Sequence, residues 1–155
     1  MDFNEAFDRV IGHEGGYVND PRDPGGETKF GISKRAYPSE DIKNLTLERA
    51  RQLYRRDYWD RGGIQNLPPF ARFDVFDVAV NSGISAAVRM LQRAVGVADD
   101  GVVGPKTLAA VGYTRPEIFR ARFAAERLDF YASLPTWPAF GRGWARRVAA
   151  NLRGV

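Results

Sequence analysis

Cysteine is absent from the 155-residue chain, and histidine occurs once, as His13. A disulfide framework is therefore impossible, and a zinc site lacks its usual thiolate and imidazole ligands. The sequence also has no apolar run long enough for a secretory signal or for a helix that crosses a membrane. From these absences we expect a soluble protein that is made in the cytoplasm without a signal peptide, needs no metal or cofactor, and is not stably inserted in a membrane.

The composition is that of a globular protein with an uneven charge. Hydrophobic residues make up 44% of the chain and charged residues 27%, as in ordinary folded domains. The net charge is +4, but from Arg115 to the C-terminus eight arginines face three acidic residues, so this third alone carries +5. Such a segment suits a polyanionic partner such as nucleic acid, anionic lipid or a cell-wall polymer. On the evidence of charge alone, an ordinary solvated helix face is the better interpretation than a binding site for a polyanion.

Helix signals dominate the sequence. Asp2 and Glu5 have the spacing of a capping box, and the helix they start is expected to run to Gly15-Gly16. Residues 70–81 fit a buried helix or a strand, and we choose a helix because their neighbours are helical. The other expected helices are 47–61 after a Thr46 cap, 85–95 up to Gly96, 105–111 from Pro105, 118–134 opened by Thr114–Glu117, and a last helix that follows a turn near residue 137.

Strand signals are confined to residues 27–33, directly after the turn Pro24-Gly25-Gly26. The expected fold class is therefore mainly α, with a small β element after the first helix. We expect residues 1–67 to form an N-terminal part and residues 68–155 a helical C-terminal part. The two should pack as one compact unit, and the protein should be a monomer.

Residues 13–33 are acidic and rich in glycine, and Glu14 is the most informative of them. If the first helix reaches this position, Phe3, Phe7 and Glu14 lie within about 60° of one another on its buried face. Burial and the dipole at the helix C-terminus would then raise the pKa of the carboxyl group, as a general acid requires. The spacing is equally compatible with a carboxylate that points into solvent at a frayed helix end.

Asp23 is the candidate for a second carboxylate, with Asp20 as its competitor. Both lie in rigid turns that contain proline, where Asp also occurs simply because its side chain accepts nearby backbone N–H groups. Together with Glu14, one of them would form the acid and base, or acid and nucleophile, of a glycosidase. A calcium loop built from these residues and Glu27 is disfavoured, because their spacing departs from the twelve-residue pattern.

Several ordered motifs run through nearly the whole chain. They are Glu14-Gly-Gly-Tyr17, Asn19-Asp20-Pro21, Asp23-Pro24-Gly25-Gly26, Thr28, Gly31-Ile32, Asp77-Val-Ala-Val-Asn81-Ser-Gly83, Leu91-Gln92, Asp100-Gly-Val-Val-Gly104-Pro105-Lys-Thr107 and Phe140-Gly-Arg-Gly143-Trp144-Ala-Arg-Arg147. In this order they resemble the glycoside hydrolase family 108 muramidases of phage endolysins and of bacterial proteins first called secretion activators. The resemblance implies a lysozyme-like fold whose residues 1–67 are catalytic and whose residues 68–155 include a predicted peptidoglycan-binding segment.

The resemblance also implies the reaction, which is hydrolysis of the bond between N-acetylmuramic acid and N-acetylglucosamine with Glu14 as catalytic acid. In the wider group of phage lysozymes an Asp or Cys and then a Thr follow the Glu. Here eight residues separate Glu14 from Asp23 and four separate Asp23 from Thr28, one fewer than in that group. By resemblance Asp23 is the base or electrostatic stabiliser, Thr28 orients a water, and Gly31 belongs to a strand that lines the sugar cleft.

Peptidoglycan glycan strands are the partner that this resemblance implies. A bacterial protein without a signal peptide would reach the cell wall through a holin or a dedicated secretion system. The alternative functions are a non-catalytic wall-binding module and a lytic transglycosylase that acts on the same bond. A nucleic-acid-binding protein ranks last, since only the basic C-terminal third suggests it.

Other side chains have two interpretations each. Tyr17 adjoins Glu14 and is expected to stack on a sugar ring, whereas Trp137 and Trp144 are expected to pack in the interior. The Asn81 amide either binds an N-acetyl group or caps a helix. Residues 99–107 contact glycan or peptide, or simply form a loop that enters a helix.

Overall fold

A computed structural model of the chain describes residues 1–12 and 15–154. The mainly α fold class is confirmed, and the small β element lies where it was expected. The elements are α1 (Phe3–Ile11), β1 (Thr28–Lys29), β2 (Ile32–Ser33), α2 (Leu47–Tyr54), a π-helix (Arg55–Asp60) that continues α2, a 3₁₀ turn (Ile64–Asn66), α3 (Pro69–Ser82), α4 (Ile84–Val95), α5 (Pro105–Tyr113), α6 (Pro116–Ser133) and α7 (Trp137–Arg153).

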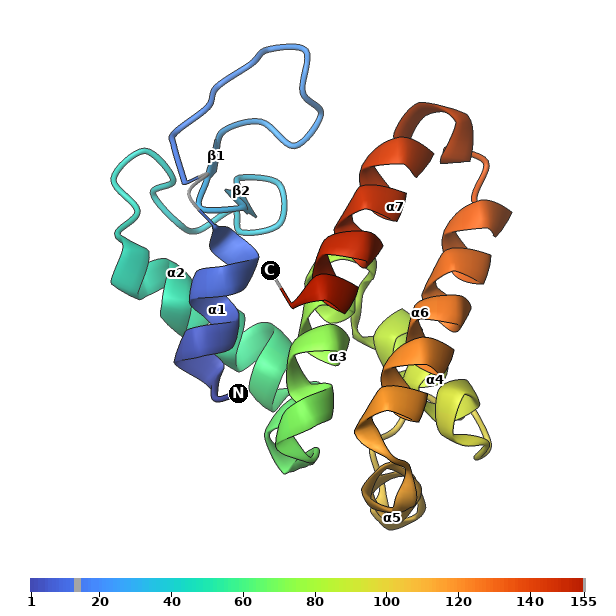
Figure 1. Cartoon of the computed structure of the whole chain (residues 1–155). Coiled ribbons are helices and arrows are strands. Elements are labelled where there is room, and N and C mark those ends of the chain that lie inside the picture. The colour runs from blue at the N-terminus through green and yellow to red at the C-terminus, as the bar shows by residue number, and fades with distance from the viewer. Residues whose placement is uncertain (13–14, 155) are drawn as a thin grey trace.

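Two groups of elements make up the molecule (Figure 1). In one group α1 and α2 lie side by side, with the β1–β2 hairpin and its long loops at one end of the pair. In the other, α6 and α7 pack on each other, and α6 also contacts α3 and α4. None of the helices in the described part of the chain is both long enough and apolar enough to cross a membrane.

An aromatic core joins the two groups. Phe3 and Phe7 project from α1 and pack edge-on against Trp59 and Tyr54, each with ring centroids 5.4 Å apart. Trp59 in turn contacts Phe76 of α3, again at 5.4 Å. Edge-to-face pairs of this kind each contribute about 0.5–1.5 kcal/mol beyond their buried area. The core therefore runs across residue 67 without interruption.

The first helix begins as predicted but ends early. The capping box is confirmed, because the Asp2 carboxylate accepts the Glu5 N–H and the Glu5 carboxylate accepts the Asp2 N–H, both at 2.9 Å. The expected extension to Gly15-Gly16 is wrong, since α1 ends at Ile11 and Gly12 adopts a left-handed φ of 58°. The inference that Glu14 lies on the buried face of this helix assumed that the helix reaches residue 14, and α1 does not extend that far. Glu14 itself, like His13, lies outside the described residues.

The later helices follow the sequence with one correction. Thr46 caps α2 by accepting the Arg49 N–H at 3.1 Å, and residues 70–81 are helical, as chosen. Thr114 does not cap α6, because its hydroxyl donates instead to the carbonyl of Ala110 in α5 at 2.8 Å. The turn expected near residue 137 lies just before it, at residues 135–136, and α7 already begins at Trp137 with a proline in its first turn.

A buried carboxylate fixes α6 and α7 to α3. Asp77 is 1% exposed and accepts hydrogen bonds from Arg127 at 2.7 Å, from Arg147 at 3.0 Å and from Asn151 at 2.8 Å. Burial raises the pKa of Asp77, but the hydrogen bond from Arg147 and the charge of Arg127 outweigh burial and hold that pKa below its ordinary value. Two arginines of the basic C-terminal third, the buried Arg127 and the half-buried Arg147, are therefore ion-pair partners of a buried carboxylate. The expectation of a purely solvated face is wrong for them.

Candidate active site

The β1–β2 hairpin is the element nearest in sequence to the predicted catalytic residues. Its strands pair Thr28 with Ser33 and Lys29 with Ile32, so only Phe30 and Gly31 form the turn. Both turn residues have left-handed φ values, 51° and 73°, which is the requirement of a type I′ hairpin. Gly31 therefore lies in the turn and not in a strand, contrary to the expectation for it.

Tyr54 of α2 holds the hairpin turn. Its hydroxyl donates to the carbonyl oxygen of Phe30 at 3.1 Å. A Cβ on Gly31 would lie 2.3 Å from that hydroxyl oxygen, so only glycine allows the turn to approach the tyrosine this closely. The turn is thus anchored to the helical core by one buried side chain.

The segment that follows Glu14 packs on the same hairpin. A Cβ on Gly15 would lie 2.6 Å from Cδ1 and 2.8 Å from Cε1 of Phe30, so the Gly15 backbone rests directly on the aromatic ring. The first glycine of the Glu14-Gly-Gly motif is therefore required by packing. The second is different, because no described atom lies within 4 Å of a Cβ built on Gly16.

A loop from Val18 to Thr28 carries the candidate second carboxylates. Val18 and Thr28 close it by exchanging two backbone hydrogen bonds, each of 2.8 Å. Asp23 is exposed, and its Oδ1 accepts the Gly25 N–H at 2.8 Å, which is the turn-forming role that Asp often has. The Asp20 carboxylate has a charged side-chain partner as well, since it accepts hydrogen bonds from Nε and Nη2 of Arg22 at 3.0 and 2.8 Å. This hydrogen bonding lowers the pKa of Asp20.

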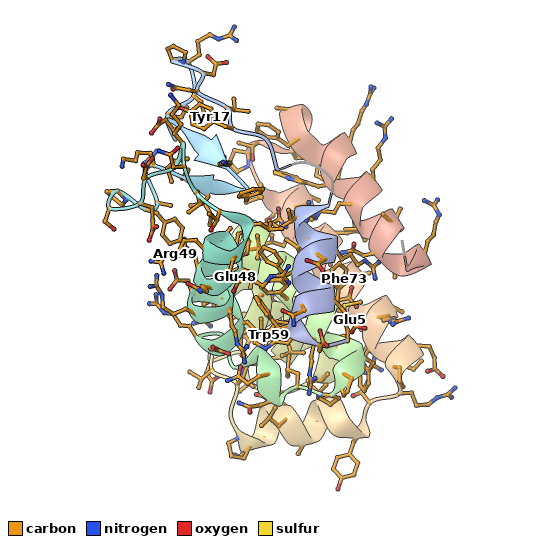
Figure 2. All side chains as sticks on the ribbon, turned by 90° about the vertical axis from the view of Figure 1, so that its left-hand side faces the viewer. Glu5, Tyr17, Glu48, Arg49, Trp59 and Phe73 are labelled. Atoms are coloured by element: carbon orange, nitrogen blue, oxygen red, sulfur yellow. The ribbon has the colours of Figure 1, made fainter. Side chains whose placement is uncertain are left out.

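The three remaining predicted residues have local partners. The Tyr17 hydroxyl donates to Glu27 Oε1 at 2.6 Å, and this hydrogen bond raises the pKa of Tyr17. Figure 2 shows Tyr17 beside the hairpin, in the loop that leads to it. Thr28 donates to the Gly26 carbonyl at 3.4 Å. Asn81 lies in the last turn of α3, where its amide donates at 2.7 Å to the carbonyl of Asp77 in the same helix.

An open groove of about 760 Å³ lies next to this region. One wall is the loop of residues 36–39, and the other is formed by the π-helix and the first turn of α4. Tyr58 lines the groove, and its ring centroid lies 5.6 Å from that of Tyr54, the residue that holds the hairpin turn. The groove and the hairpin are therefore linked through two adjacent aromatic rings. The volume of the groove falls in the range of ordinary ligand-binding sites.

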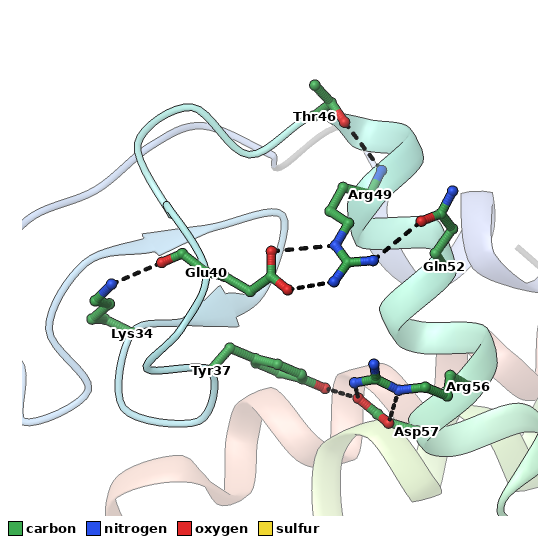
Figure 3. A network of polar contacts seen from close by, with 8 residues as sticks. All are labelled: Lys34, Tyr37, Glu40, Thr46, Arg49, Gln52, Arg56 and Asp57. Carbon is green, nitrogen blue, oxygen red and sulfur yellow. Dashed lines mark hydrogen bonds and ion pairs between the residues drawn. The ribbon is translucent and has the colours of Figure 1, made fainter.

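Polar contacts hold the loop wall of the groove in place (Figure 3). Tyr37 donates to Asp57 on the π-helix at 2.9 Å, and Glu40 forms a two-pronged ion pair with Arg49 of α2 at 2.6 and 3.2 Å. The hydrogen bond from Arg56 outweighs burial and lowers the pKa of Asp57, whereas burial raises that of Tyr37. The wall is thus tied to the helices at two points.

Sequence reasoning did not select Tyr37, Arg56 or Arg61, all of which line this groove. Helical periodicity places such residues on faces of a regular α-helix, whereas residues 55–60 form a π-helix, in which a wider turn changes the direction of each side chain. The available signal was the density of arginine and aromatic residues in residues 55–61.

A second ordered loop lies in the C-terminal part. The two N–H groups of the Gln92 amide are shared among three acceptors, which are Asp100 at 2.7 Å, the Val102 carbonyl at 2.9 Å and the Thr107 hydroxyl at 3.1 Å. The Gln92 amide oxygen accepts the Gly101 N–H at 2.9 Å. Residues 99–107 are therefore held to α4 by one buried side chain. A cavity of about 380 Å³ lies beside them.

Within residues 1–12 and 15–154, no cluster of three or more His, Cys, Asp or Glu side chains has the arrangement of a metal site. The late tryptophans pack in the α6–α7 pair: Trp144 stacks on Tyr131 with centroids 4.8 Å apart, and Trp137 lies 6.2 Å from Trp144.

Comparison with known proteins places this arrangement in a family. Residues 7–83 match the family described as Glycosyl hydrolase 108, and residues 86–149 match the one described as Predicted Peptidoglycan domain. The solved structure titled "Structure of Brucella abortus SagA" is 38% identical, with a TM-score of 0.83 over 95% of this chain and 89% of that chain. The chain belongs to the glycosyl hydrolase 108 family. No match was found among curated proteins.

Membership in the glycosyl hydrolase 108 family confirms the family predicted from the ordered motifs. The first family match includes Glu14, the 18–28 loop, the hairpin and the π-helix, and the second includes the 99–107 loop. Together the two matches support a glycoside hydrolase whose partner is peptidoglycan and which acts on the bacterial cell wall.

Proposed function

We propose that the protein is an N-acetylmuramidase, which hydrolyses the bond between N-acetylmuramic acid and N-acetylglucosamine with Glu14 as the general acid. What carries the proposal is the family match over residues 7–83, which contains the Glu14-Gly-Gly-Tyr17 motif. The packing of Gly15 on Phe30 supports it, since this contact holds the residue after the acid against the hairpin, next to the loop that carries Asp23.

In this reaction Glu14 protonates the glycosidic oxygen as the bond to the anomeric carbon breaks. A second carboxylate then activates water or stabilises the oxocarbenium-like transition state. We assign this role to Asp23 over Asp20, because the Asp20 carboxylate is occupied by two nitrogens of the Arg22 guanidinium group, whereas the Asp23 carboxylate accepts one backbone N–H. Thr28 remains the candidate for orienting the water.

Substrate contacts are proposed for Tyr17 and Asn81, and a positioning role for Gly31. Tyr17 is exposed and held by Glu27, so its ring is available for a sugar face. The Asn81 amide has one nitrogen donor engaged with its own helix, which leaves its carbonyl oxygen for an N-acetyl N–H. Gly31 keeps the hairpin turn close to Tyr54 and so sets the position of the cleft wall.

Mass analysis of the muropeptides released from purified peptidoglycan tests this proposal. Hydrolysis by a muramidase leaves a reducing N-acetylmuramic acid end on each fragment. An anhydro end would show a lytic transglycosylase instead, and binding to the polymer without any released fragment would show a wall-binding module. Either of the last two results would contradict the proposal.

A further inference from the structure

The groove beside the π-helix carries more positive than negative charge. Arg56 and Arg61 line it, and Arg89 reaches its edge, where Nε lies 3.4 Å from the Ser85 hydroxyl. The carboxylate among the lining residues is Asp57. Arg56 is bound to that carboxylate at 2.6 Å, while Arg61 is exposed on the rim.

The groove also offers neutral donors and apolar surface. α4 begins in it with Ile84 and Ser85, and the residue before this helix is Gly83, which has no side chain to cap the N–H groups of the first turn. The rings of Tyr37 and Tyr58 and the Ile84 side chain supply apolar area. Carboxylates next to short aliphatic groups match such a lining.

The sugars of the glycan strand do not offer carboxylates next to short aliphatic groups. The rings of N-acetylglucosamine and N-acetylmuramic acid are uncharged once the lactyl group is joined to a peptide, so the free carboxylates of peptidoglycan belong to its stem peptides. Each stem peptide projects sideways from the glycan strand. The loop wall of the groove follows β2 directly, and the Tyr37 N–H donates to the Ser33 carbonyl at 3.0 Å. A glycan strand along the hairpin would therefore place such a side branch next to the groove.

We propose that this groove is a subsite for the stem peptide, with Arg61 as the residue that binds one of its carboxylates. The inference rests on the proposed function, since it assumes that the glycan strand lies along the hairpin. The ion pair of Glu40 with Arg49 and the hydrogen bond of Tyr37 with Asp57 keep the loop wall in position before substrate arrives (Figure 3). Such preorganisation lowers the entropy cost of binding.

Two polymers separate peptide recognition from glycan recognition. One is intact peptidoglycan, and the other is the same polymer after its stem-peptide carboxylates have been converted to neutral amides. Removal of the peptides by an amidase would instead expose a new lactyl carboxylate on every N-acetylmuramic acid. We expect Arg61→Gln to lower kcat/KM on the intact polymer by about 3- to 10-fold, as for the loss of one partly solvated charge contact. On the amidated polymer the variant and the wild type should have equal rates. On the intact polymer Arg61→Lys should restore most of the loss.

Arg55→Gln is the matched control, because Arg55 carries the same charge at the start of the π-helix that Arg61 directly follows, but pairs with Asp60 at 3.7 Å and does not line the groove. It should leave both rates unchanged. Equal losses for Arg61→Gln on the two polymers, or no loss on either, would overturn the subsite. If the wild type released no reducing ends from either polymer, the proposed function would fail, and the subsite with it. Melting curves of each variant exclude unfolding.

Discussion

The two glycines after Glu14 allow a sharp test of the geometry next to the proposed acid. In Gly15→Ala the added methyl carbon would lie 2.6 Å from Cδ1 and 2.8 Å from Cε1 of Phe30. Carbon atoms in contact are normally about 3.5–4.0 Å apart, so the ring or the loop must move by roughly 1 Å. Because Tyr54 holds the backbone carbonyl of Phe30 and the Phe30 ring packs against the hydrophobic core, the ring has little freedom to retreat.

Overpacking of this kind costs about 1–3 kcal/mol of unfolding free energy. For a domain of this size we therefore expect Gly15→Ala to lower Tm by about 3–10 °C. Activity should fall further, by up to about 10²-fold, because a displacement of about 1 Å at a catalytic group has effects of that order. Calorimetric melts and the rate of muropeptide release measure the two effects on the same preparation.

Gly16→Ala is the control for this substitution. No described atom lies within 4 Å of its new methyl group, and Gly16 is not among the glycines with left-handed φ. Alanine at position 16 should leave the unfolding free energy unchanged or raise it by about 0.4–1 kcal/mol, because alanine reduces the conformational entropy of the unfolded chain. Equal stability and activity for the two variants would refute the contact between Gly15 and Phe30.

Three further predictions concern the core, pH and metals. Arg147→Gln should lower the unfolding free energy by about 1–3 kcal/mol, because it removes a charged donor from buried Asp77. The control Arg146→Gln should change the unfolding free energy by less than about 0.5 kcal/mol, and urea titrations that give equal values for the two variants would contradict this. Burial raises the pKa of Asp74 from its ordinary value of 3.8 to about 6, so the stability that its protonated form contributes is complete below the unfolded value and is lost as pH rises to 6. Asp74→Asn should therefore gain Tm relative to wild type as pH rises from about 4 to 6, and a constant difference over this range would count against it. Dialysis against EDTA should leave activity intact, and a loss that divalent ions restore would show a required metal.

Local signals in the sequence predicted most of the helices. The Asp2 capping box, the Thr46 cap and proline at the first position of α5 each depend on residues within one turn, so no tertiary knowledge was needed. The end of α1 was missed, because Gly12 and Gly15 are equally able to stop a helix and only the fold selects between them. Thr114 failed as a cap for a similar reason, since the end of α5 offers its hydroxyl a nearer acceptor.

The candidate site was less accessible to sequence reasoning. The motif around Glu14 and the hairpin at residues 28–33 were found from turn residues and resemblance. The groove was not found, because its lining comes from three separated segments and from a π-helix that no periodicity argument anticipates. Asp77 and Arg147 were noted only as parts of motifs, and their pairing across 70 positions in the chain appears only in the fold.

The rate of muropeptide release by Glu14→Gln tests the central claim most directly. Glutamine keeps the size and hydrogen bonding of the side chain but cannot deliver a proton to the glycosidic oxygen, so the rate should fall at least about 10²-fold while Tm stays unchanged. Glu48→Gln makes the same chemical change on the surface of α2, where Glu48 pairs with Arg51 at 3.8 Å, and should keep the wild-type rate. A folded Glu14→Gln protein that released muropeptides as fast as the wild type would contradict the assignment of Glu14 as the acid.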